Sequence, residues 1–381
     1  MPEAPEFDVA VVGAGIIGLA HAYLGARSGK RVALFERQPA ASGASIRNFG
    51  LIWPIGQAPG TLHQMALRSR EIWVDLLRQT GLPYDASGSL HAAYVKQEAD
   101  VGREFAELGP ALGYECGWLT TEQTLQRSAA LSPDGLLGAL WSSTELTVDP
   151  RQLIAELPRF LRDRWNVEFH FNTPVTAVEE GALYAKARKW KAGMIVIAAG
   201  DDFDTLFPCC FDVPGLTRAK LQMMRTVVQP RAWRLGPALA FGLSFRHYPT
   251  FQVCETLPAL KQRIAEEWPE INAWGIHVMV SQTPRGELTI GDSHEYAFSV
   301  DIFDKAYVNE LILNYARKHM RVPSWKIAET WHGVYAKHPE LPYLACDPIK
   351  GIRVVTVTSG IGMTLSFGLA ERMLRDMGVL P

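Results

Sequence analysis

The sequence has few cysteines, and their spacing fits no common disulfide or metal-binding pattern. Its 381 residues contain five cysteines with no C-x-x-C pair among them: Cys116, Cys209, Cys210, Cys254 and Cys346. An odd number at irregular spacing argues against a disulfide framework and favours reduced thiols. The adjacent Cys209 and Cys210 are expected to be structural, and no metal ligands are assigned.

Strong net charge and long apolar runs are also missing. The formal net charge is −2, which provides no electrostatic footprint for nucleic acid. No run of eighteen apolar residues and no charged leader followed by an apolar segment occurs, so we expect no integral membrane segment and a cytoplasmic location. With 48% hydrophobic and 20% charged residues, the composition is that of a folded protein large enough for two domains.

The N-terminal region contains a strand, a glycine turn and a helix. Residues 7–12 (FDVAVV) read as a buried parallel strand, and residues 16–29 have helical spacing. Between them, Gly13 permits a sharp turn, Gly15 lets a pyrophosphate approach the backbone, and Gly18 lets the helix lie close to the strand. Ile16 and Ile17 begin the helix, whose free N–H groups favour phosphate. The pattern predicts a dinucleotide site.

The next strand, residues 31–38 (RVALFERQ), completes a β-α-β unit and ends in an acidic residue. Glu36 is placed to accept hydrogen bonds from an adenosine ribose, which disfavours a 2′-phosphate. The neighbouring Arg37 weakens that exclusion. The unit alone does not decide between a nicotinamide and a flavin cofactor.

The rest of the chain favours a flavin. A small-residue loop at residues 41–57 (ASGASIRNFGLIWPIGQ) follows in place of a further β-α-β repeat. Strand patterns return at residues 167–180 and 191–202, and residues 351–377 read as a strand, a glycine loop and a helix. A cofactor domain assembled from both ends of the chain is typical of a tightly held FAD.

In this order, VVGAGIIG, LFER, SGASIRNFG, TPVTAVE, IVIAAG and SGIGMTLSFGLAE resemble the D-amino-acid oxidase superfamily, which includes glycine and sarcosine oxidases. The segments RNFGLIWPIGQAPG and VVTVTSGIGMTLSFGLAE resemble most the subgroup associated with bacterial phosphonate catabolism. The resemblance implies a mixed α/β fold, in which a Rossmann-like FAD-binding domain of glutathione-reductase type is interleaved with a mixed-sheet substrate domain. We expect residues 1–81, 148–215 and 322–381 in the first domain, and 82–147 and 216–321 in the second.

The resemblance also implies the cofactor contacts. It predicts non-covalent FAD, because Cys346 matches no flavin-attachment motif. The expected contacts, besides the glycine turn and Glu36, are Ser45, Arg47 and Asn48 beside the flavin, Val175 at the adenine, Gly200 near the ribityl or pyrophosphate portion, and Gly360, Ile361, Gly362, Met363 and Thr364 at the pyrimidine end.

The substrate segment departs from the family pattern. Amino-acid-oxidising members carry W-x-G-x-R-P, whose arginine binds the substrate carboxylate. Here Trp331 and Gly333 match, but Tyr335 stands in the arginine position and Lys337 follows it. A phenol and an ammonium are compatible with a tetrahedral phosphonate. Further candidates for the substrate pocket are Arg225, His247, Tyr248 and Trp53.

These features predict an FAD-dependent oxidoreductase that acts on a small amine, 2-aminoethylphosphonate or its N-methyl derivative. Hydride transfer to flavin N5 would give an imine that hydrolyses to an aldehyde, with O₂ as electron acceptor and hydrogen peroxide as product. The alternatives are a glycine, sarcosine or D-amino-acid oxidase, a quinone-linked dehydrogenase of the same fold, and a flavin-binding module without turnover. Homo-oligomers are possible.

Overall fold

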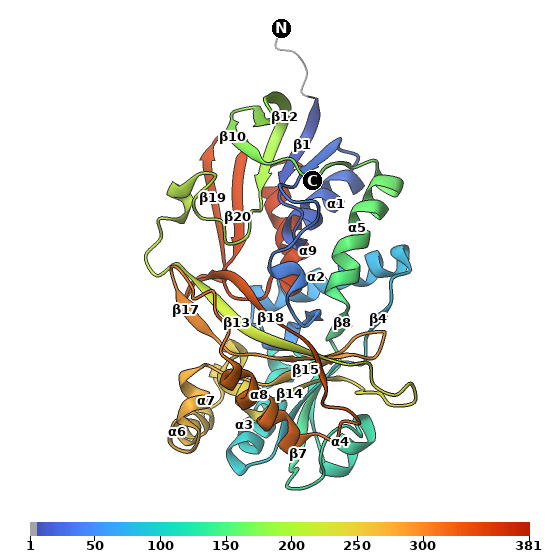
Figure 1. Ribbon diagram of the computed structural model, residues 1–381, viewed down its shortest axis with the longest axis vertical. Helices are drawn as coiled ribbons and strands as arrows, with labels where there is room; N and C mark the ends of the chain where they lie inside the picture. The colour runs from blue at the N-terminus through green and yellow to red at the C-terminus, as the bar shows by residue number, and fades with distance from the viewer. Residues whose placement is uncertain (1–5) are drawn as a thin grey trace.

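A computed structural model describes residues 6–381, in which two large sheets occupy the two halves of the molecule (Figure 1). The first sheet has eight strands, and the second has nine. The cofactor-type patterns of the sequence lie in the first sheet, so its strands come from both ends and the middle of the chain.

The first sheet is built around β1, the strand before the glycine turn. β1 pairs in parallel with β2 on one side and with β12 on the other, which confirms the predicted β-α-β unit. Its strands are β1 (Phe7–Val12), β2 (Val32–Phe35), β9 (Glu168–His170), β10 (Val175–Glu179), β11 (Ala182–Ala185), β12 (Arg188–Ile197), β19 (Tyr343–Ile349) and β20 (Ile352–Val357).

Helices cover this sheet with a continuous apolar core. The helices α1 (Ile16–Arg27), α2 (Thr61–Thr80), α5 (Pro150–Trp165) and α9 (Gly362–Asp376) contribute to one buried hydrophobic cluster. Nearly all of α1 is buried, since it lies against α5, α9 and the sheet together. The helix that begins at the glycine turn is therefore held rigidly.

The second sheet is mixed. β13 is its longest central strand and pairs antiparallel with β16, β17 and β18. The strands are β5 (Ser89–Ala93), β6 (Cys116–Leu119), β7 (Gly138–Ser142), β13 (Thr217–Thr226), β14 (Ala238–Phe241), β15 (Met279–Gln282), β16 (Leu288–Gly291), β17 (Glu295–Ala297) and β18 (Ile327–Lys337). The helices α3 (Lys96–Leu108), α4 (Thr121–Arg127), α6 (Leu257–Glu267), α7 (Pro269–Ala273) and α8 (Ala306–His319) lie on this half (Figure 1).

Two local expectations differ from the structure. Residues 84–95 suggest two strands paired with each other, but β4 (Tyr84–Asp85) pairs with β8 (Leu146–Val148) and β5 joins the second sheet. β8 also pairs with β3 (Leu51–Ile52), so a small three-stranded sheet forms. In addition, β18 lies in residues expected for the cofactor domain, yet it pairs with β13 of the second sheet. One strand thus connects both halves.

The expectation of reduced thiols is wrong for one pair. Cys210 and Cys346 form a disulfide, although 136 positions separate them in the sequence. Cys210 lies in a short 3-10 turn, and β19 brings Cys346 beside it. Cys116, Cys209 and Cys254 are free.

The mixed α/β architecture agrees with the expected fold class. Within residues 6–381, none of the helices combines the length and the apolar character needed to span a bilayer.

Candidate functional site

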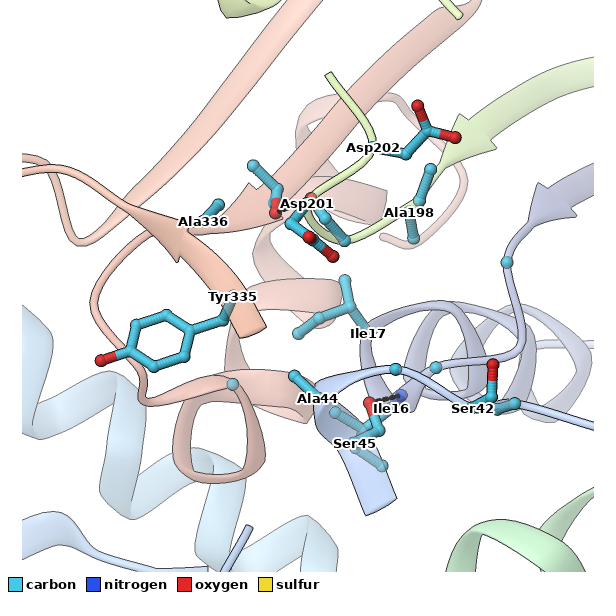
Figure 2. A pocket seen from close by; sticks show the side chains of 18 of the residues that line it. Ile16, Ile17, Ser42, Ala44, Ser45, Ala198, Asp201, Asp202, Tyr335 and Ala336 are labelled. Atoms are coloured by element: carbon cyan, nitrogen blue, oxygen red, sulfur yellow. Dashed lines mark hydrogen bonds between the residues drawn. The ribbon is translucent and has the colours of Figure 1, made fainter. Parts of the chain in front are cut away.

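A cavity of about 560 Å³ extends between the β1–α1 turn and the strands β13 and β18. Its wall includes residues from the N-terminal turn, the 41–57 loop, the end of β12, β18 and the start of α9 (Figure 2). Residues from distant parts of the chain thus form one elongated site. Most of the residues expected to contact a cofactor line it.

The glycine turn explains two of the predicted positions. Gly13 has φ +104°, and a Cβ there would lie 2.4 Å from the carbonyl oxygen of Ala198. A Cβ on Gly18 would lie 1.9 Å from the carbonyl oxygen of Gly13. Gly13 lines the cavity, whereas Gly18 lies behind the turn and holds the helix against it. Larger residues would displace the backbone at both positions.

The N-terminus of α1 is open toward the cavity. In the described structure, Gly15 provides no side-chain cap and the first turn contains no acidic residue. Ser45 Oγ from the neighbouring loop accepts a hydrogen bond from the Ile16 N–H at 2.9 Å (Figure 2). Ile17 points into the cavity nearby. This arrangement suits a phosphate group at the positive end of the helix dipole.

Glu36 organises the turn as well as facing the cavity. Its Oε2 accepts a hydrogen bond from the Ala14 N–H, and its Oε1 accepts one from the Gln38 N–H, both at 2.9 Å. A carboxylate has room for further donors, such as ribose hydroxyls. Arg37 lies beside it, but its guanidinium forms an ion pair with Asp202 at 2.7 Å.

The loop that follows is held by its own polar groups. Asn48 Nδ2 donates hydrogen bonds to the carbonyl oxygens of Ala44 and Ser45, and Asn48 Oδ1 accepts one from Gly50 N–H. Arg47 lines the cavity and also donates to the His332 carbonyl oxygen at 3.4 Å. The loop thereby presents backbone and cationic groups to the cavity.

The C-terminal glycine loop forms part of the opposite wall. Gly360, Gly362 and Met363 line the cavity where α9 begins. Ile361 and Thr364 do not line it: Ile361 packs against the core, and Thr364 Oγ1 accepts a hydrogen bond from the Trp53 N–H at 2.9 Å.

Val175 and Gly200 line the cavity together with an acidic residue that the sequence reasoning missed. The Asp201 side chain points into the cavity from the segment after β12 (Figure 2). Burial raises the pKa of Asp201. This position is better suited to accepting hydrogen bonds from hydroxyl groups of a ligand than to contacting a phosphate, because the Asp201 carboxylate and a phosphate would repel each other. The signal in the sequence was the Asp201–Asp202 pair directly after a buried strand.

The end of the cavity near β18 contains a cluster of polar side chains. Tyr335 lines it close to the C-terminal loop, since a Cβ on Gly360 would lie 3.0 Å from the Tyr335 hydroxyl oxygen. Burial raises the pKa of Tyr335 well above its usual value. Met223 of β13 and Asp292, which follows β16, complete this wall. Asp292 was not predicted from the sequence.

The other candidate substrate residues divide into two groups. Lys337, His247 and Tyr248 lie outside the direct lining but next to its polar end. Burial lowers the pKa of His247, and the Lys337 charge contributes to the same shift. Burial raises the pKa of Tyr248, and the charge of Asp292 adds to that effect. These residues therefore lie within electrostatic range of the same region.

Arg225 and Trp53 lie elsewhere. Arg225 is buried on β13, with its guanidinium 3.9 Å from the Asp149 carboxylate and near the Trp331 ring. Trp53 is 3% exposed and lies beside the rings of His91 and Tyr248. Neither lines the cavity, so their contacts are those of internal packing.

The donor set of the cavity fits FAD. The glycine turn leaves no room for a side chain, the α1 N-terminus has no acidic residue and only the neutral Ser45 hydroxyl at its Ile16 N–H, and Glu36 lies at one end. The far end is closed by Tyr335 and the start of α9. When bound, the flavin would supply the acceptor for a hydride, which carries two electrons.

Comparison with known proteins agrees with this assignment. A family model described as "DAO: FAD dependent oxidoreductase" matches residues 8–375. Glycine oxidase of Geobacillus kaustophilus is 29% identical over 160 residues, which cover 40% of this chain and 42% of that protein. Mitochondrial sarcosine dehydrogenase of Homo sapiens is 28% identical over 174 residues, which cover 45% of this chain and 19% of that protein. The matches thus span less than half of these relatives.

A solved structure supports the fold along the whole chain. The crystal structure of glycine oxidase from Geobacillus kaustophilus superimposes with a TM-score of 0.76 at 20% identity, covering 97% of this chain and 94% of that one. At this identity, the likeness supports the architecture and leaves the substrate open.

Proposed function

This chain belongs to the DAO family of FAD-dependent oxidoreductases, and we propose that it oxidises a small amine whose other end is a phosphonate, 2-aminoethylphosphonate or its N-methyl derivative. The oxidation product would be an imine that water hydrolyses to an aldehyde. Molecular oxygen is the proposed electron acceptor, with hydrogen peroxide as its product.

The observation that carries the phosphonate proposal is the ammonium of Lys337. Lys337 lies two residues after Tyr335 on β18, so both side chains project from the same face of the strand. Burial lowers the pKa of Lys337, and no carboxylate within residues 6–381 offsets this cost. A partly buried cation without an anionic partner is well placed to receive an anion from a ligand.

Tyr335 supports the same choice. A single phenol in the arginine position offers one donor, whereas a carboxylate is best held by the forked donors of a guanidinium. A tetrahedral phosphonate can accept separate hydrogen bonds from a phenol and an ammonium that approach from different directions. The relatives favour a second candidate, because glycine oxidase and sarcosine dehydrogenase carry names of α-amino-acid substrates. Glycine and sarcosine are therefore the rival substrates.

A substrate panel tests the proposal. 2-Aminoethylphosphonate and its N-methyl derivative should exceed glycine, sarcosine and D-alanine by at least 100-fold in kcat/KM. A higher kcat/KM for glycine, sarcosine or D-alanine would contradict the proposal. Peroxide release in air would support an oxidase, whereas reduction by substrate without peroxide would indicate a dehydrogenase.

The variant Lys337→Met links the proposal to the residue. We expect its KM for the phosphonates to rise at least tenfold, while kcat changes less, because the ammonium contributes to binding. Lys350→Met removes an exposed lysine from the β19–β20 turn and serves as the matched control. An equal effect of the two substitutions would count against Lys337.

A cytoplasmic location stays a prediction from the sequence. The Cys210–Cys346 disulfide weighs against it, because such bonds persist mainly in oxidising compartments.

A further inference from the structure

Asp292 is a buried carboxylate in the cavity wall, and one of its two oxygens has no hydrogen-bond partner within residues 6–381. It is 4% exposed and lines the cavity with Met223 and Tyr335. Its Oδ1 accepts no hydrogen bond from any residue of the described chain. Buried polar atoms are nearly always paired, and an ionised carboxylate needs a partner more than most. Because Oδ1 is itself buried against His277, a ligand in the cavity would reach this carboxylate through its other oxygen.

His277 is the protein group nearest to this carboxylate. His277 Nε2 lies 3.1 Å from Asp292 Oδ1, without the alignment of a hydrogen bond. Burial lowers the pKa of His277 well below its usual value, and neighbouring histidines and Arg246 lower it further. The lowered pKa favours the neutral imidazole, which provides no positive charge for Asp292.

No lysine or arginine within residues 6–381 forms an ion pair with Asp292, whose one ion-pair neighbour is His277. Burial raises the pKa of Asp292 well above its usual range. The titratable groups that interact with it are His277 before β15, Tyr248 after β14, Tyr296 at β17 and Tyr335 on β18. The charged and titratable groups that interact with His277 and its neighbouring histidines in turn include Arg246, His247, His294 and Lys337. Burial lowers the pKa values of the histidines in this set and raises those of the tyrosines, so it favours the neutral form of both.

The three histidines do not form a metal centre in this arrangement. Their ring nitrogens lie within 4.8 Å of one another. However, the rings of His247 and His277 are stacked 3.8 Å apart at 25°, and those of His277 and His294 are stacked 5.3 Å apart at 19°. The rings of His247 and His294 are tilted by 39° at 4.7 Å. An imidazole binds a metal in its own ring plane, so the two stacked pairs do not direct their lone pairs at one ion. Asp292 is thus not accounted for by a metal.

We propose that Asp292 binds the substrate ammonium and removes one proton from its nitrogen before oxidation. This inference rests on the proposed function, since it requires an amine substrate. The proton passes from R–NH₃⁺ to the Asp292 carboxylate, so a neutral amine and a carboxylic acid are formed and the charge is balanced. The N–H bond breaks, its electron pair stays on nitrogen, and the carboxyl proton leaves to solvent after product release.

The chemistry requires such a step. Loss of a hydride from the carbon beside nitrogen needs the nitrogen lone pair, but an alkylamine with a pKa of about 10 is almost wholly protonated at pH 7. A general base typically contributes 10²–10⁴-fold, and it works best when its pKa lies near the operating pH. Asp292 and Lys337 would then bind opposite ends of one substrate, the cationic end and the anionic end.

The test compares Asp292→Asn with the wild-type holoenzyme over pH 6–10 by anaerobic stopped-flow reduction with 2-aminoethylphosphonate. At pH 7 the limiting rate of the variant should fall at least 100-fold. The loss should shrink about tenfold per pH unit toward pH 10, because solution then supplies the neutral amine. Asp347→Asn, a surface carboxylate paired with Arg353, controls for the change in charge. A loss below tenfold, or a constant ratio at all pH values, would overturn the proposal.

Two further measurements keep the proposal falsifiable. The limiting rate of flavin reduction by the wild-type enzyme should level off well below pH 10, once the Asp292 carboxylate is ionised. A continued tenfold rise per pH unit up to pH 10 would refute Asp292 as the base. The urea midpoint of Asp292→Asn should exceed that of the wild type by an amount that grows as the pH rises from 4. The reason is that the folded state disfavours the charged carboxylate, which only the wild type carries. A pH-independent difference would contradict a buried carboxylate. If no amine of the panel reduces the wild-type flavin, the proposed function itself fails.

Discussion

The contact between Gly18 and Gly13 makes a strong prediction about cofactor binding. In Gly18→Ala, the new Cβ would lie 1.9 Å from the Gly13 carbonyl oxygen and 3.2 Å from Val11 Cγ1. The first contact is with backbone, so the glycine turn itself has to move. Overpacking destabilises a folded structure by about 3 kcal/mol at the upper end of its usual range. Replacing glycine by alanine within a helix stabilises it by about 1 kcal/mol through helix propensity. The net cost is about 2 kcal/mol, which corresponds to roughly 30-fold weaker FAD binding if the turn opens.

The control for this experiment lies on the same helix. Gly25→Ala gains the same propensity, while its Cβ would meet the Val32 Cγ2 methyl at 3.3 Å, a side chain that can shift. We expect Gly25→Ala to bind FAD like the wild type. Titration of the apoprotein with FAD, followed by fluorescence, gives the dissociation constants, and urea unfolding gives the stabilities. Unchanged FAD affinity in Gly18→Ala would refute the packing argument.

Three further predictions concern single groups. Glu36→Gln should weaken FAD binding at least tenfold in the same titration, because an amide nitrogen cannot accept a hydrogen bond and either the Ala14 N–H or the Gln38 N–H loses its acceptor; unchanged affinity would exclude this role. Cys346→Ser, which frees Cys210, should lower the free energy of unfolding by about 2–4 kcal/mol without reductant and by little with it; equal losses would contradict the disulfide. Lys220→Met should lower the free energy of unfolding in urea by about 3 kcal/mol, because the fully buried Lys220 ammonium pairs with the carboxylates of Glu295 and Asp304. An unchanged free energy of unfolding would show that these pairs contribute nothing.

The cofactor half of the site was predictable because its rules are local. Gly13, Gly18 and Glu36 act within one β-α-β unit, where spacing along the chain determines spacing in the structure. A local contact also begins α4, where the Thr120 side chain accepts a hydrogen bond from the Gln123 N–H.

The substrate half depends on pairings between distant segments. Asp292 reaches the cavity only because β16 pairs with β13, and β13 with β18. No periodicity in the sequence gives that register. The Cys210–Cys346 bridge and the pairing of β4 with β8 were missed for the same reason. The predicted Arg225 is on the correct strand but is placed near Asp149, which no local pattern indicates.

The central claim is that the cavity oxidises an amine with a phosphonate at its other end. Its most direct test is anaerobic reduction of the protein-bound flavin by equal concentrations of 2-aminoethylphosphonate, its N-methyl derivative, glycine, sarcosine and D-alanine, followed as bleaching of the flavin absorbance. We expect rapid bleaching by one or both phosphonates and at least 100-fold slower bleaching by the three amino acids. Faster bleaching by glycine, sarcosine or D-alanine would contradict the claim.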